Sequence, residues 1–209
     1  MAVVTIIVLA LTAVLTGMKT AYCIEWCTER EMPFYRVWTN RRLYPAVCIF
    51  LIIYLLCWYI TNQSMPMVRL CDLVCSYILL AVVDIKRKVV PDPIMVCFVT
   101  GQLLMGVVAL QPTELWHMIW TGSAFGLFIL LFAFVSKGKF GMGDVLLLWG
   151  TAVTAGWAYT LMILTIGMFL SFVFGIGVII CKRGTLKTEL PFVPFLAAGI
   201  IVHTMIFVM

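Results

Sequence analysis

The chain has 209 residues, of which 64% are hydrophobic and only 11% are charged, and its mean hydropathy is +1.14. A soluble domain carries about 25% charged residues, and a soluble fold of this length cannot bury so much apolar side chain. The composition therefore excludes a soluble enzyme, a disordered chain and a small disulfide scaffold. The net charge of +5 is modest, so we expect no nucleic-acid partner, and a polytopic membrane protein remains.

Apolar segments separated by charged loops predict an all-α membrane bundle of about eight transmembrane helices, with six to eight tolerated. A helix needs about 20 apolar residues to cross a bilayer. Bare polar backbone is not viable in lipid, so each segment is expected to be helical. The predicted spans are 3–17, 45–61, 70–84, 94–110, 116–136, 145–156, 158–181 and 190–209.

The apolar stretch 145–181 is too long for one span, because it would form about 55 Å of helix against a bilayer core of about 30 Å. We predict a break at Thr154-Ala155-Gly156-Trp157. Gly156 permits a tight turn there, and Trp157 favours the membrane interface. The first piece, 145–156, is then short, and we expect it in a thinned or protein-lined part of the membrane.

The positions of the basic residues predict the orientation. Of the 14 lysines and arginines, 13 fall in alternate loops and one, Arg69, falls on the other side. The positive-inside rule then places the four basic loops in the cytoplasm and both chain ends outside. No basic residue precedes the first apolar run, so we do not expect a cleaved signal peptide. The 13 residues are Lys19, Arg30, Arg36, Arg41 and Arg42 in loop 18–44, then Lys86, Arg87 and Lys88, Lys137 and Lys139, and Lys182, Arg183 and Lys187.

Two of the nine acidic residues stand at predicted span ends on the cytoplasmic side. Asp84 ends the third span, and Asp144 opens the sixth within Gly141-Met142-Gly143-Asp144. Two carboxylates that meet share a proton, so one can activate water while the other hydrogen-bonds a scissile carbonyl. Gly141 and Gly143 would allow positive φ and close approach of a substrate backbone. Each aspartate alone could also be a helix-boundary residue.

Three segments, in this order, resemble the motifs of the prepilin leader peptidases, which are membrane aspartic peptidases. Asp84-Ile85-Lys86-Arg87-Lys88-Val89-Val90-Pro91-Asp92 resembles the first-aspartate motif, and Gly141-Met142-Gly143-Asp144 resembles the Gly-x-Gly-Asp (GxGD) motif. Pro191-Phe192-Val193-Pro194-Phe195-Leu196-Ala197 resembles the last-helix motif. Asp92, Leu146 and Val193 stand where the family usually has Asn, Lys and Gly.

The resemblance implies a peptidase membrane domain over 70–209, preceded over 1–69 by two transmembrane helices with a shortened cytoplasmic loop at 18–44. It implies that Asp84 and Asp144 are catalytic. It also implies supporting or substrate-binding roles for Gly141, Gly143, Pro91, Asp92, Lys86, Pro191 and Pro194. The expected reaction removes a short basic leader from a type IV prepilin or pseudopilin-like precursor, at the cytoplasmic face of the cell (inner) membrane, in pilus assembly or protein secretion.

We expect no metal or organic cofactor. Helix dipoles predict that Asp144, at a helix start, is the ionised base, and that Asp84, at a helix end, is the acid.

Longer family members carry two Cys-x-x-Cys pairs linked to zinc and also methylate the new N-terminus. Here the first loop holds one pair, Cys23 and Cys27, and Cys48 is a poor third ligand. A tetrahedral zinc site needs four ligands, so neither zinc nor methyltransferase activity is expected.

Two alternatives stay open at this point. One is a non-enzymatic small transporter or assembly subunit that uses the acids for proton coupling. The other is a related GxGD protease of the presenilin or signal-peptide-peptidase type. The natural precursor and the oligomeric state also stay open.

Overall fold

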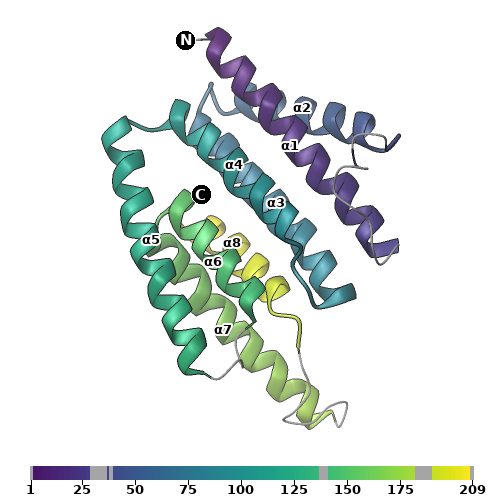
Figure 1. Cartoon of the computed structure of the whole chain (residues 1–209), viewed down its shortest axis with the longest axis vertical. Coiled ribbons are helices and arrows are strands. Elements are labelled where there is room, and N and C mark those ends of the chain that lie inside the picture. The colour runs from purple at the N-terminus through teal and green to yellow at the C-terminus, as the bar shows by residue number, and fades with distance from the viewer. Residues whose placement is uncertain (1, 29–36, 38–39, 137–140, 182–189, 208–209) are drawn as a thin grey trace.

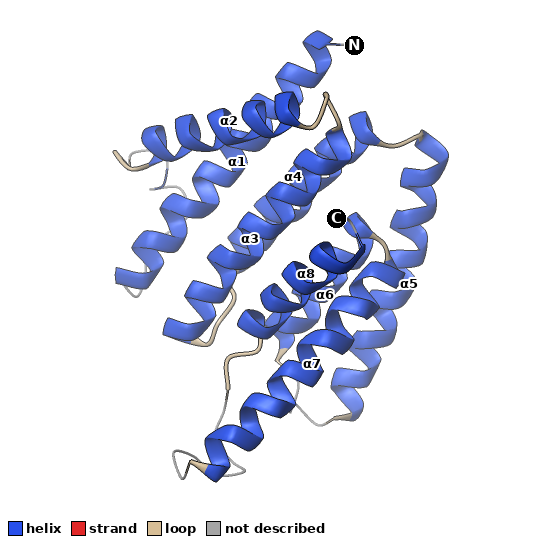
Figure 2. Cartoon of the chain, turned by 180° about the vertical axis from the view of Figure 1, so that it is seen from behind, coloured by secondary structure: helices blue, strands red, loops and turns tan. Residues whose placement is uncertain are grey.

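The computed structural model describes residues 2–28, 37, 40–136, 141–181 and 190–207, and these form eight α-helices and no strand (Figures 1 and 2). The all-α prediction is confirmed. The helices are α1 (Ala2–Thr28), α2 (Leu43–Ile60), α3 (Met65–Arg87), α4 (Asp92–Ala109), α5 (Pro112–Val135), α6 (Met142–Ala155), α7 (Trp157–Ile180) and α8 (Val193–Phe207). Arg30, Arg36, Lys137, Lys139 and the basic loop 182–189 lie outside the described residues, so the predicted orientation stays a prediction.

The helices have the lengths and compositions of a multi-pass membrane protein. Within the described part of the chain, α1, α2, α4, α5 and α7 are long and apolar enough to cross a membrane, and α6 and α8 are shorter apolar helices. Helix α3 has 23 residues but carries Arg69, Asp72 and Asp84. It packs against α1, α2, α4 and α8, and Figure 1 shows α3 and α4 between the α1–α2 pair and the α5–α8 group.

Helix α1 is longer than predicted, because residues 18–28 continue the helix instead of starting the cytoplasmic loop 18–44. Lys19 is therefore not a loop residue: its side chain is 1% exposed and forms an ion pair with Asp72. Cys23 and Cys27 also lie on α1, about one turn apart. The prediction failed because a lysine was taken to end the span, whereas a buried partner carboxylate lets the helix continue through it.

The predicted break at Gly156 is confirmed. Helix α6 ends at Ala155 and α7 begins at Trp157, and Gly156 between them has φ +95°, a conformation that suits glycine. Seven of the 14 residues of α6 are buried, because α4, α5 and α7 all pack against it. A protein-lined position therefore accounts for the shortness of α6.

Two glycines let α5 approach α6 closely. A Cβ on Gly122 would lie 2.2 Å from the carbonyl oxygen of Ala152, and a Cβ on Gly126 would lie 2.3 Å from Cγ of Trp149. The two glycines are four residues apart, which is the small-x-x-x-small spacing of close helix pairs in membranes. This contact fixes α6, and with it Asp144, against the rest of the bundle.

Candidate active site

Asp84 and Asp144 line one cavity of about 280 Å³, although 60 residues separate them in the sequence. Asp84 comes from the last turn of α3, and Asp144 comes from the first turn of α6. The two carboxylates are near enough to interact electrostatically. The cavity is also lined by Lys88, Val89, Val90, Asp92, Gly141, Met142, Gly143 and Leu146.

Asp84 is held by the beginning of α8. Its side chain is 7% exposed, and its Oδ2 accepts a hydrogen bond from the backbone N–H of Val193 at 3.0 Å. The Phe192 amide and Lys88 also interact favourably with this carboxylate. Val193 is the first residue of α8, where a helix leaves its backbone N–H groups without intrahelical partners. A helix start therefore supplies hydrogen-bond donors to a buried carboxylate.

Glycines leave space around Asp144. A Cβ on Gly141 would lie 3.2 Å from Oδ2 of Asp144, and a Cβ on Gly143 would lie 3.2 Å from Cβ of Val90. Gly141 has φ −64°, and the structure gives positive φ to no described glycine except Gly156. The expectation of positive φ at the two motif glycines is therefore wrong, and the tight packing around them explains their small size.

Of the other predicted site residues, Asp92, Pro191 and Pro194 lie in or beside the cavity, whereas Lys86 does not. Asp92 lines the cavity and opens α4 directly after the buried Pro91. Pro191 and Pro194 are half-buried and flank the amides that reach Asp84. Lys86 is exposed on α3 and does not line the cavity, whereas Lys88 does.

A larger apolar groove of about 410 Å³ adjoins the cavity, and Asp92 and Leu146 line both. It lies between α4 and α6, and its other lining residues are Met95, Val96, Val99, Thr100, Trp149, Gly150 and Val153. Sequence reasoning missed this groove, because its apolar residues do not differ in type from those that face lipid. The long-range contact of Val193 was missed too, since Val193 was noted only as a departure from the family motif.

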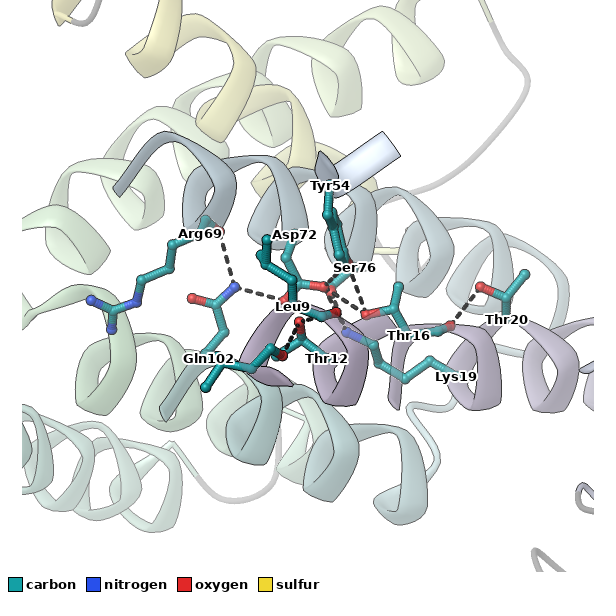
Figure 3. Close-up of polar contacts among 11 residues, drawn as sticks. Leu9, Thr12, Thr16, Lys19, Thr20, Tyr54, Arg69, Asp72, Ser76 and Gln102 are labelled. Atoms are coloured by element: carbon teal, nitrogen blue, oxygen red, sulfur yellow. Dashed lines mark hydrogen bonds and ion pairs between the residues drawn. The ribbon is translucent and has the colours of Figure 1, made fainter. Parts of the chain in front are cut away.

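A second polar cluster, drawn in Figure 3, shares no residue with the lining of the cavity. Asp72 is fully buried in α3, about 18 Å along the helix from Asp84. It pairs with Lys19 at 3.3 Å, and it accepts hydrogen bonds from Thr16, Tyr54 and Gln102, while Lys19 also donates to Ser76. These contacts join α1, α2, α3 and α4.

One comparison with known proteins, a scan against protein families, finds a match. The model of the type IV leader peptidase family matches residues 71–176, which is just over half of the chain. The matched segment contains both Asp84 and Asp144 and ends within α7. No curated protein and no solved structure matches the chain. The chain belongs to the type IV leader peptidase family.

Proposed function

We propose that this protein is an aspartic endopeptidase that removes the basic leader from prepilin or pseudopilin-like precursors at the cytoplasmic face of the cell membrane. The observation that carries the proposal is the pair of carboxylates, Asp84 and Asp144, in one cavity of a member of the leader peptidase family. Both stand at helix ends. A peptide bond just outside the bilayer, ahead of a membrane-embedded helix, could reach such a position.

Peptide hydrolysis by this pair needs one ionised and one protonated carboxyl group. The ionised group takes a proton from water as the water oxygen attacks the scissile carbonyl carbon. The protonated group donates its proton to the carbonyl oxygen. When the tetrahedral gem-diol intermediate collapses, the group that took the proton from water passes it to the leaving nitrogen and the C–N bond breaks. The other group recovers its proton from a hydroxyl of the intermediate, so both carboxyl groups return to their starting states.

The contacts favour Asp84 as the ionised base and Asp144 as the proton donor, which reverses the assignment from helix dipoles. A hydrogen bond to a charged group contributes about 1.5–3 kcal/mol. A helix dipole contributes about 0.3–1 kcal/mol on a surface charge and up to about 2 kcal/mol on a partly buried one. Asp84 accepts such a bond from Val193 and lies near Lys88. The hydrogen bond and Lys88 together oppose the effect of the helix dipole on the ionised carboxylate, which favours Asp84 as the base.

The groove between α4 and α6 suits the hydrophobic helix of the precursor. It is lined mainly by apolar side chains and adjoins the cavity at Asp92 and Leu146. A helix lying in this groove would lead its N-terminal end to the two aspartates. The exposed carboxylate of Asp92 at the junction would attract the basic leader.

Co-expression with a pilin-like precursor tests the proposal, with leader removal followed as a mobility shift. We expect Asp84→Asn and Asp144→Asn each to abolish the shift while the protein still accumulates in the membrane. Glu114→Gln is the matched control, because Glu114 is an exposed carboxylate at the start of α5 and does not line the cavity. Undiminished cleavage by either Asp→Asn variant would rule out the two-aspartate mechanism.

A further inference from the structure

Arg69 places a buried positive charge in α3, and no described residue forms an ion pair with it. Its side chain is 9% exposed, and its Nε and Nη2 atoms have no hydrogen-bond partner among the described residues. Gln102 donates to the backbone oxygen of Arg69, not to its side chain. Figure 3 shows the guanidinium turned away from Asp72, whose carboxylate is already paired with Lys19. Burying a charge without a partner costs free energy, so a bound anion would stabilise this site.

The guanidinium lines a pocket of about 250 Å³. The other lining residues are Pro66, Leu70, Leu73, Gln102, Leu110, Met118, Ala155 and Tyr159. They come from the start of α3, the end of α4, the start of α5, the end of α6 and the start of α7. The pocket is therefore at the opposite end of these helices from the aspartates, and most of its wall is apolar.

The depth of Arg69 in the membrane points to the chemistry of the anion. Helix α3 has 23 residues and measures about 34 Å, against a hydrocarbon core of about 30 Å. Arg69 is its fifth residue, so the pocket lies near a headgroup boundary, about 22 Å along α3 from Asp84. Phospholipid phosphates are the abundant anions at such a boundary, and their acyl chains match an apolar wall.

We propose that the Arg69 pocket binds the phosphodiester of a membrane phospholipid, at a site separate from the peptidase cavity. The planar guanidinium offers parallel N–H donors that fit two phosphate oxygens. The apolar wall would receive the glycerol and the first part of an acyl chain. The bound lipid would neutralise Arg69 and hold together the ends of five helices. The site is thus a stabilising lipid site, independent of leader cleavage.

Delipidated protein in dodecyl maltoside provides the test, with dioleoylphosphatidylglycerol as the probe and native mass spectrometry as the readout. We expect saturable binding of one lipid to the wild type. Arg69→Met should weaken this binding about tenfold or more, as expected for loss of a charge-assisted contact. Arg42→Met is the matched control, because Arg42 is an exposed arginine outside the pocket, and it should bind like the wild type. Equal lipid binding by Arg69→Met would overturn the proposal.

Three further probes distinguish the sources of the anion. Glycerol phosphate or inorganic phosphate binding as tightly as the lipid would overturn the lipid assignment. Oleate binding as tightly as the lipid would also overturn it and would assign the site to a carboxylate.

Thermal unfolding tests the proposal without relying on a variant. The lipid should raise the Tm of the wild type, whereas dioleoylglycerol, which lacks the phosphate, should not. Equal shifts from both would overturn it.

Unfolding also yields a result that a general loss of packing would not produce. Without lipid, Arg69→Met should unfold at a higher temperature than the wild type, because it removes an uncompensated buried charge. With phosphatidylglycerol, the wild type should gain stability and the variant should not. A variant that is less stable than the wild type and still gains the full lipid shift would contradict the proposed role of Arg69.

Discussion

The hydrogen bond from Val193 to Asp84 can be removed without changing either of the two carboxylates that we propose to be catalytic. Val193→Pro deletes the backbone N–H that donates to Oδ2 of Asp84 at 3.0 Å. Val193 is the first residue of α8, and proline is well tolerated at that position because its φ suits the helix start. The preceding Phe192 accepts hydrogen bonds from Phe195 and Leu196, as a helix N-cap does. An N-cap residue typically has an extended backbone, which is also what a following proline requires.

The expected loss follows from the strength of that one contact. A hydrogen bond to a charged group contributes about 1.5–3 kcal/mol, which corresponds to about 10-fold to 150-fold in rate if it acts fully in the transition state. The Phe192 amide still interacts with Asp84 in the variant, so we expect about a 10-fold lower rate of leader removal. Single-turnover cleavage of a purified precursor, quantified on gels, measures this rate.

Val193→Ala separates the hydrogen bond from packing. Val193 is fully buried, so the alanine variant loses side-chain contacts but keeps the N–H donor. We expect Val193→Ala to unfold at a lower temperature yet to cleave much faster than Val193→Pro. Two results would refute the reasoning: cleavage by the proline variant at the wild-type rate, or the same loss of rate in both variants.

Three other single substitutions test the buried ion pair, the contact between α5 and α6, and the cavity, and Gly177→Ala is the control for the two glycine variants. Lys19→Met leaves the buried Asp72 carboxylate unpaired and should destabilise the protein by about 3–5 kcal/mol, and adding Asp72→Asn should recover part of this loss in thermal unfolding. Gly122→Ala should destabilise by about 1–3 kcal/mol, since its Cβ would overlap the α6 backbone. The control is Gly177→Ala, with no atom within 4 Å of its Cβ, which should be neutral or stabilise by up to about 1 kcal/mol. Gly143→Ala should slow cleavage about tenfold with little change in Tm, because it displaces the first turn of α6 by a few tenths of an ångström.

Most of the helical arrangement follows from one physical constraint, the thickness of the bilayer. Residues 145–181 are too long for a single crossing, which predicts a break, and Gly156 and Trp157 locate it where the structure places it. The same reasoning fails at Lys19, because a charge ends a span in lipid but not where Asp72 faces it inside the bundle. Sequence patterns describe the lipid environment well, and they carry little information about pairs formed between helices.

In the candidate site, too, the sequence predicts some residues and does not reveal a contact between helices. Asp84 and Asp144 are recognisable because each stands in a local motif at a span end. The donor to Asp84 is a backbone amide 109 residues away, and a backbone amide leaves no mark in the identity of its residue. Its place could have been inferred from the prolines at 191 and 194, since they predict a helix start with free N–H groups. That inference also requires knowing which helix start packs against α3.

Helix α3 shows how a few charged residues can each have a distinct role in an apolar bundle. It carries Arg69, Asp72 and Asp84 at three depths, and each faces a different environment. Asp72 has a full set of partners from neighbouring helices, so it stabilises the bundle. Asp84 has backbone donors on one side and a cavity on the other, so its carboxylate can be reached from that cavity. Arg69 has an apolar pocket and no anion among the described residues. In a low-dielectric interior an ion must be paired, solvated or bound to a ligand. Asp72 is paired and Asp84 faces a cavity, which leaves a ligand for Arg69, as we propose.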